Sequence, residues 1–155
     1  DATDTWMRFL VVRMLIWAEA PDVMNEMARM ADLPLEELQS PMRAIVLQYA
    51  AHHMGRAEAI KAKYWKVIEG GEKISDGKKR IRTNNGRQHI LYGLCAARDE
   101  KKKNTEEEFK MMNETLTAVF NFDKMDVASE SFSGIDQCWA IRGASEYVSN
   151  YQPAV

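Results

Sequence analysis

The chain has 155 residues, a mass of 17.8 kDa and a formal net charge of −2 at pH 7, with 46% hydrophobic and 28% charged residues. These values exclude a disordered polypeptide, which combines low hydrophobicity with high net charge. A chain of this length can bury one core without disulfides or metal. We therefore expect a single all-α domain over residues 1–155, with about six or seven helices and an extended C-terminal tail at 151–155.

Helix signals and apolar periodicity recur along most of the sequence. Pro21 suits a first helical turn, and Ser40 followed by Pro41 is typical of an N-cap and first helical position. Thr105 with Glu108 has the spacing of a capping box. In chain order, helices are predicted at about 4–18, 21–30, 33–39 (one or two turns), 40–54, 56–68, 84–103, 105–120 and 135–150.

Two stretches leave the helical pattern. A loop is predicted over 123–134, and another follows Gly70 and Gly71 up to about residue 83. The stretch after that second loop has two alternatives, because Asn85-Gly86 could open a helix or form the turn of a two-stranded hairpin. The sequence therefore predicts either a basic loop or a short β-hairpin near residues 72–89.

The first predicted helix contains the longest apolar run, WMRFLVVRMLIWA at 6–18. It is too short to cross a bilayer of about 30 Å and is interrupted by Arg8 and Arg13. Its apolar residues surround the helix axis, which predicts either a central core helix or an assembly surface. Arg13 should form a structural salt bridge rather than bind a partner, because an unpaired buried charge is unfavourable.

Charge is distributed unevenly along the chain. Residues 1–47 carry four basic and eight acidic side chains, for a net charge of −4. Residues 48–120 carry fifteen basic and ten acidic side chains, for +5, and residues 121–155 carry two and five, for −3. The run KKKNTEEE at 101–108 suits the end of one helix and the start of the next through their dipoles, so we interpret it as a structural junction. The central third is basic between two acidic ends.

The densest positive charge lies in GKKRIRTNNGRQHI at 77–90 and in the helix before it. Such a cluster can neutralise several phosphates, although basic loops also serve only to keep a surface soluble. Trp65 projects away from the apolar face of its helix and could stack on a base, whereas Tyr64 should belong to the core. The candidate nucleic-acid-binding residues are Arg56, Lys63, Trp65, Lys66, Lys73, Lys78, Lys79, Arg80, Arg82, Arg87 and His89.

The sequence offers little support for catalysis. It lacks the GxxxxGK[ST], GxGxxG and GxSxG patterns, and the adjacent His52 and His53 would point about 100° apart on a helix rather than at one metal ion. No cofactor, metal site or enzymatic activity is predicted. Cys95 and Cys138 lie on apparent apolar helix faces, where free thiols suit a reducing, intracellular and cytoplasmic setting.

The leading functional hypothesis is a non-enzymatic protein that binds the backbone of single-stranded nucleic acid, with RNA preferred, and forms homo-oligomers through its apolar and acidic end segments. The layout resembles that of a viral nucleocapsid or coat subunit in architecture only, because contacts between basic and acidic surfaces can build rings or filaments. The alternative is a helical protein–protein interaction module whose basic loop meets an acidic partner. An enzyme with an unfamiliar site ranks third.

Overall fold

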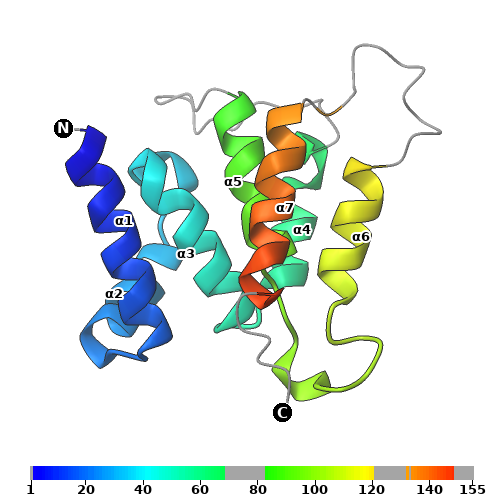
Figure 1. Ribbon diagram of the computed structural model, residues 1–155, viewed down its shortest axis with the longest axis horizontal. Coiled ribbons are helices and arrows are strands. Elements are labelled where there is room, and N and C mark those ends of the chain that lie inside the picture. Colours follow the sequence, from blue (N-terminus) through cyan, green and yellow to red (C-terminus); the bar gives the residue numbers. More distant parts are fainter. Residues whose placement is uncertain (1, 69–82, 121–131, 133, 149–155) are drawn as a thin grey trace.

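The computed structural model describes residues 2–68, 83–120, 132 and 134–148 (Figure 1). Within these residues the chain forms seven α-helices and no strand, which confirms the all-α prediction. Two short 3-10 helices, η1 (Leu35–Glu37) and η2 (Glu100–Lys102), lie in the connections. The α-helices are α1 (Ala2–Trp17), α2 (Pro21–Ala31), α3 (Ser40–His52), α4 (Ala57–Ile68), α5 (Thr83–Cys95), α6 (Lys110–Val119) and α7 (Gly134–Val148).

Helix starts follow the sequence signals only in part. Pro21 occupies the first turn of α2 as predicted, and Gly55, with a φ of 64°, separates α3 from α4. Ser40, however, is already helical, and Gln39 stands at the N-cap of α3 without a side-chain cap. Proline in the first turn explains how this helix starts without that cap, since its φ is preset and it needs no hydrogen-bond acceptor for an N–H.

Helix α5 resolves the alternatives for the stretch after residue 83. It begins at Thr83 and includes Asn85 and Gly86, so the hairpin is wrong over residues 83–92, while 79–82 lie outside the described part. The helix ends at Cys95 rather than Lys103. The Asp99 backbone N–H instead donates to the Glu108 carbonyl at 3.0 Å, which turns the chain back on itself before α6.

The turn before α6 uses Glu108 differently from a capping box. The N-cap residue of α6 is Phe109, and its side chain makes no capping bond. The Glu108 carboxylate accepts hydrogen bonds from the Asn104 backbone N–H and from Arg98, and these bonds lower its pKa. The predicted capping box of Thr105 and Glu108 is therefore wrong, because the Glu108 carboxylate stabilises the turn before α6 instead.

Helix α5 is the centre of the molecule. It contacts α3, α4, α6 and α7, and Figure 1 shows it among the inner helices, with α1 and α6 at opposite sides. The side chains of Ile90, Leu91, Leu94 and Cys95 are fully buried. Burial raises the pKa of the Cys95 thiol to about 12, whereas Cys138 on α7 is exposed. Both cysteines are free, and the apolar-face prediction holds only for Cys95.

Two glycines allow close packing around α5. A Cβ atom at Gly93 would lie 2.7 Å from the Leu47 Cβ of α3. A Cβ atom at Gly143 of α7 would overlap the Tyr92 carbonyl oxygen, so the α7 backbone lies directly against that of α5. Gly143 lowers helix propensity by about 1 kcal/mol. Its lack of a side chain is nevertheless what admits α7 to this position.

An ion pair joins the first helix to the last one. The Arg13 Nη2 of α1 lies 2.5 Å from Glu146 Oε1 of α7, and the Tyr92 hydroxyl donates to the same carboxylate at 2.6 Å. The Glu146 side chain is almost fully buried and Arg13 is partly buried. Burial, and then the hydrogen bond to Glu146, raises the pKa of Tyr92. The structural salt bridge predicted for Arg13 is confirmed.

Helix α1 lies at the periphery, although it is the most apolar segment of the sequence. Phe9 and Ile16 face the core, while Met14 is 70% exposed and Met7 is 53% exposed. The prediction of a central core helix is therefore wrong, and an exposed apolar face is what the structure contains. In the methionine-rich helix α2, by contrast, Met27 is buried and its neighbours pack against the core.

None of the described helices combines the length and apolarity that crossing a bilayer requires. The predicted tail over 151–155 and nearly all of the predicted loop over 123–134 lie outside the described residues.

Candidate nucleic-acid interface

The structure places the predicted contact residues in three groups. Lys73, Lys78, Lys79, Arg80 and Arg82 lie outside the described residues, between α4 and α5 in the sequence. A second group lies on α4 or just before it: Arg56, Lys63, Trp65 and Lys66. The side chains of Trp65 and Lys66 are not described. The third group, Arg87 and His89, belongs to α5.

Arg56 and Lys63 lie on one side of α4. Seven residues, or about two helical turns, separate them, so their backbones are about 10 Å apart along the axis. Arg56 Nη1 lies 2.7 Å from Asp32 Oδ1, in a pair whose side chains are 40% and 67% exposed. An exposed pair of this kind contributes only about 0–1 kcal/mol. Arg56 can therefore exchange its carboxylate partner for a phosphate at little expense.

The two basic residues border an apolar hollow of about 250 Å³, which we call the α4 hollow. Tyr64 lines it and is half-buried, so the expectation that this ring belongs wholly to the core is only partly met. Lys63 Nζ lies 5.1 Å from the centre of the Tyr64 ring. The other apolar lining comes from the end of α2, from the segment around η1 and from α3, including Leu33, Pro34, Leu38, Val46 and Ala50.

The α4 hollow is small for a metabolite site, since such pockets usually occupy about 300–1,000 Å³. It has room for a single planar ring or one side chain. An aromatic side chain beside a cation can stack on an unpaired base of any sequence. The charge pattern predicted Arg56 and Lys63 as contact residues, but it did not show that Leu33, Pro34 and Leu35 lie beside them.

Arg87 does not belong to this surface. Its Nη2 lies 2.9 Å from Asp136 Oδ2 of α7, and the two side chains are only 12% and 1% exposed. The Phe132 ring lies 5.2 Å from its guanidinium carbon. A phosphate contact would require this pair to open and would leave Asp136 buried without its cation, which is strongly destabilising. Arg87 therefore packs between α5 and α7, and we no longer count it among the predicted nucleic-acid-binding residues.

The side chain of His89 also lies away from the surface. Its side chain is buried, and its ring meets Trp139 of α7 edge to face with centroids 5.3 Å apart. Burial, followed by the positive charge of Arg43, lowers the pKa of His89 from 6.5 to about 4. The imidazole is thus neutral at pH 7 and adds no positive charge for a phosphate. His89 lies on the same buried face of α5 as Ile90 and Leu94, which a charge map of the segment does not show.

Most other described cations of the central third are already paired. Lys61 lies 2.6 Å from Glu114, and Lys102 and Arg98 pair with Glu107 and Glu108 respectively. The pairs around 98–108 stabilise the connection between α5 and α6, but α5 ends at Cys95 and α6 begins at Lys110, so the predicted junction of two helix termini at 101–108 is wrong. These pairs line a hollow of about 530 Å³, and its lining holds four acidic and four basic side chains, so its charge is balanced. This surface has no net attraction for a polyanion.

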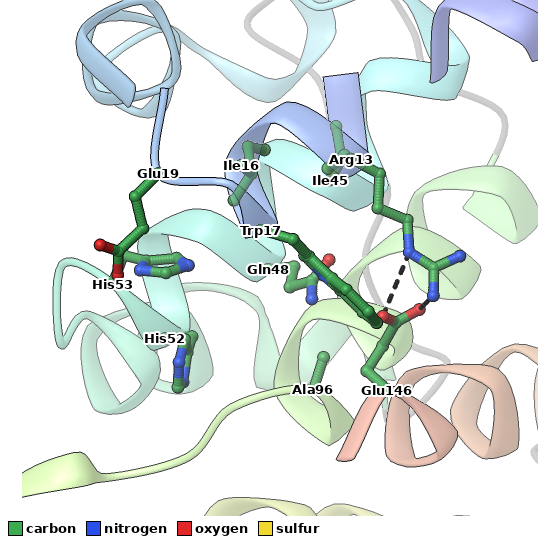
Figure 2. A pocket seen from close by; sticks show the side chains of 10 residues that line it. All are labelled: Arg13, Ile16, Trp17, Glu19, Ile45, Gln48, His52, His53, Ala96 and Glu146. Carbon is green, nitrogen blue, oxygen red and sulfur yellow. Dashed lines mark hydrogen bonds and ion pairs between the residues drawn. The ribbon is translucent and has the colours of Figure 1, made fainter. Parts of the chain in front are cut away.

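A smaller hollow of about 200 Å³ lies between the C-terminal parts of α1, α3, α5 and α7 (Figure 2). Figure 2 shows the Arg13 guanidinium directed at Glu146, with the Trp17 indole beside Gln48. The ion pair neutralises both charges at this wall. On the opposite wall, His52 Nδ1 lies 3.1 Å from the Arg98 carbonyl oxygen, and its ring meets that of His53 nearly at right angles.

The histidine pair is therefore part of the packing at the end of α3. Among the described residues, no three histidine, cysteine or acidic side chains converge on a point that could hold a metal ion. The α4 hollow, with its two accessible cations and its aromatic ring, is the stronger candidate for binding a ligand.

No protein-family model, curated protein or solved structure matches the chain.

Proposed function

We propose that the protein is a non-enzymatic, self-associating subunit that binds the backbone of single-stranded nucleic acid, with RNA preferred, as a nucleocapsid or coat subunit does. The observation that carries the proposal is the charge segregation, with +5 over residues 48–120 between ends of −4 and −3. A basic centre attracts phosphates, and each phosphate contact releases counterions and strengthens binding at low salt.

The geometry of α4 supports this proposal at one point. Arg56 and Lys63 can each meet a phosphate, and Tyr64, which lines the same hollow, can receive a base that leaves the stack. Basic residues 73–82 follow α4 directly in the sequence and would extend the same path. Sequence-specific recognition is not part of the proposal, because phosphate contacts carry no base information.

The proposal is tested by titrating a labelled single-stranded RNA with the protein at several salt concentrations. Affinity should fall linearly with salt on logarithmic axes, with a slope of about −0.7 for each phosphate contact. The double variants Lys79→Glu with Arg80→Glu, and Arg56→Glu with Lys63→Glu, should each flatten the slope by roughly 1.4. Lys103→Glu is the matched control, because it reverses one exposed charge within the connection between α5 and α6.

An affinity that does not change with salt, or that neither double variant alters, would refute nucleic-acid binding. A DNA strand of the same sequence tests the preference for RNA. The ultraviolet spectrum of the purified protein gives an early indication, because co-purifying nucleic acid raises the absorbance of its bases.

The second candidate is a helical protein–protein interaction module with a basic loop for an acidic partner. The exposed apolar side chains of α1 favour it, since large apolar patches mark interaction surfaces. Native mass spectrometry after nuclease treatment separates the two candidates. A stoichiometric complex with another protein that survives nuclease treatment would support the interaction module. If every complex disappears once nuclease has removed the nucleic acid, the protein binds nucleic acid instead.

A further inference from the structure

We propose that Asp32 gives the α4 hollow a preference for cytosine over uracil among the bases of a bound single strand. This preference rests on the proposed binding of nucleic acid, and it adds a base contact to phosphate contacts that carry no base information. The charges of the hollow suggest it. Among the described residues that line the hollow, Asp32 is the one acidic side chain, and Arg56 and Lys63 are the basic ones.

The end of α2 fixes the position of Asp32. This residue is the C-cap of α2, and its backbone N–H donates to the carbonyl oxygens of Arg29 and Met30. The next two residues, Leu33 and Pro34, continue into the apolar wall of the hollow. The carboxylate therefore lies at the rim of the hollow, on a backbone that the end of the helix holds in place.

The Asp32 carboxylate keeps the capacity to accept further hydrogen bonds. Its Oδ1 accepts one from Arg56 Nη1 at 2.7 Å, and its Oδ2 accepts none from the described residues. The side chain is 67% exposed, so a ligand in the hollow can reach it. When Arg56 turns to a phosphate, both carboxylate oxygens are left without that donor, beside a second negative charge. A hydrogen-bond donor on the base would then stabilise the complex.

An ionised carboxylate accepts hydrogen bonds and donates none. It therefore favours a base with an exocyclic amino group, which cytosine carries where uracil has a carbonyl oxygen. That carbonyl oxygen would be repelled by Asp32, so one carboxylate attracts one pyrimidine and disfavours the other. Adenine and guanine also carry amino groups, but the hollow, at about 250 Å³, suits a single ring. Cytosine is the base that meets both conditions.

The test compares binding to homopolymeric strands of cytidine and of uridine, with equal length, equal salt and neutral pH. The wild-type protein should bind the cytidine strand about fivefold more tightly, which is the lower end of the discrimination that one base contact provides. Asp32→Asn should bring the ratio of the two affinities close to unity, because an amide both donates and accepts. Glu37→Gln is the matched control, since it removes an exposed carboxylate of η1 that does not line the hollow.

The ratio of affinities separates base recognition from simple repulsion. If Asp32 only repelled phosphates, Asp32→Asn would strengthen binding to both strands equally and leave the ratio unchanged, and that result would overturn the proposal. Equal wild-type affinities for the two strands would also overturn it, while salt-dependent binding to both would leave the proposed function standing. Absence of binding to either strand at low salt would refute the proposed function itself, and the base preference with it. Circular dichroism checks that both variants remain folded.

Discussion

From their sequences, α1 would be expected at the centre of the fold and α5 nearer its surface, but the structure shows the reverse. The α1 segment is nearly all apolar around its axis, yet Met14 remains 70% exposed. The α5 segment, TNNGRQHILYGLC, begins with a polar stretch, yet Leu91 and Leu94 have no exposed surface at all. Small residues and the number of neighbouring helices, more than apolar content, determine which helix is central. Glycine lets α3 and α7 approach α5 closely, and α1 has no comparable contact.

The largest effect is expected where two backbones touch. Gly143→Ala should destabilise the fold by about 3 kcal/mol or more, because the new methyl group would overlap the Tyr92 carbonyl oxygen and push α7 from α5. Gly134→Ala is the matched control, since nothing lies within 4 Å of a Cβ atom there. Denaturant unfolding compares the two variants. Equal stabilities would mean that α5 and α7 are not in backbone contact.

We expect the free energy of unfolding to fall at acid pH because His89, on the central helix α5, is buried. Its pKa is about 4 in the folded protein against 6.5 when free, so the unfolded chain takes up a proton first as the pH falls. Stability is fully present above pH 6.5 and declines towards pH 4, by up to about 3 kcal/mol. His89→Leu should remove this part of the pH dependence. The measurement is the unfolding free energy of the wild type and of His89→Leu at a series of pH values. Parallel curves for the two proteins would mean that His89 is solvent-exposed.

Loss of the ion pair between Arg13 of α1 and Glu146 of α7 should have an intermediate effect on stability. Arg13→Met leaves Glu146 buried with only Tyr92 among its partners described above, and we expect a loss of about 2 kcal/mol. The value is below that of a fully buried pair because Arg13 is 29% exposed. Thermal unfolding measures the loss, and the double variant Arg13→Met with Glu146→Met should recover part of it. No recovery would indicate that the arginine acts by packing rather than by charge.

The smallest effect is expected at the candidate interface. Arg56→Met removes an exposed pair with Asp32 and should change stability by less than about 1 kcal/mol. The same substitution should still weaken RNA binding. Measuring stability and RNA affinity together separates a residue that holds the fold from one that is available to a ligand. A large loss of stability would place Arg56 with Arg13 among the structural arginines.

The sequence predicted the helices well where local signals decide. Pro21, the glycine at 55 and the apolar spacing of 56–68 each correspond to an observed boundary or helix. It failed where partners distant in the chain decide. Nothing local ends α5 at Cys95, because the following residues favour a helix, and the turn is instead held by contacts with Glu108.

The same limit applies to the candidate site. Five of the basic residues lie outside the described part, so their role stays a prediction. Arg87 and His89 looked equivalent to them in a charge map, yet Asp136 and Trp139, about fifty residues later, bury both. Net charge over a segment counts every cation, whereas only tertiary structure shows which of them already have a carboxylate.

The contact between Tyr92 and Gly143 also has a consequence for the order of events during synthesis. Helices α5 and α7 pack side by side, but about fifty residues separate their contacting positions. A chain elongates at roughly 5–20 residues per second, so α5 waits several seconds for the helix that covers it. During that interval the face around Tyr92 is open to water or to a chaperone. The arrival of α7 then completes the core.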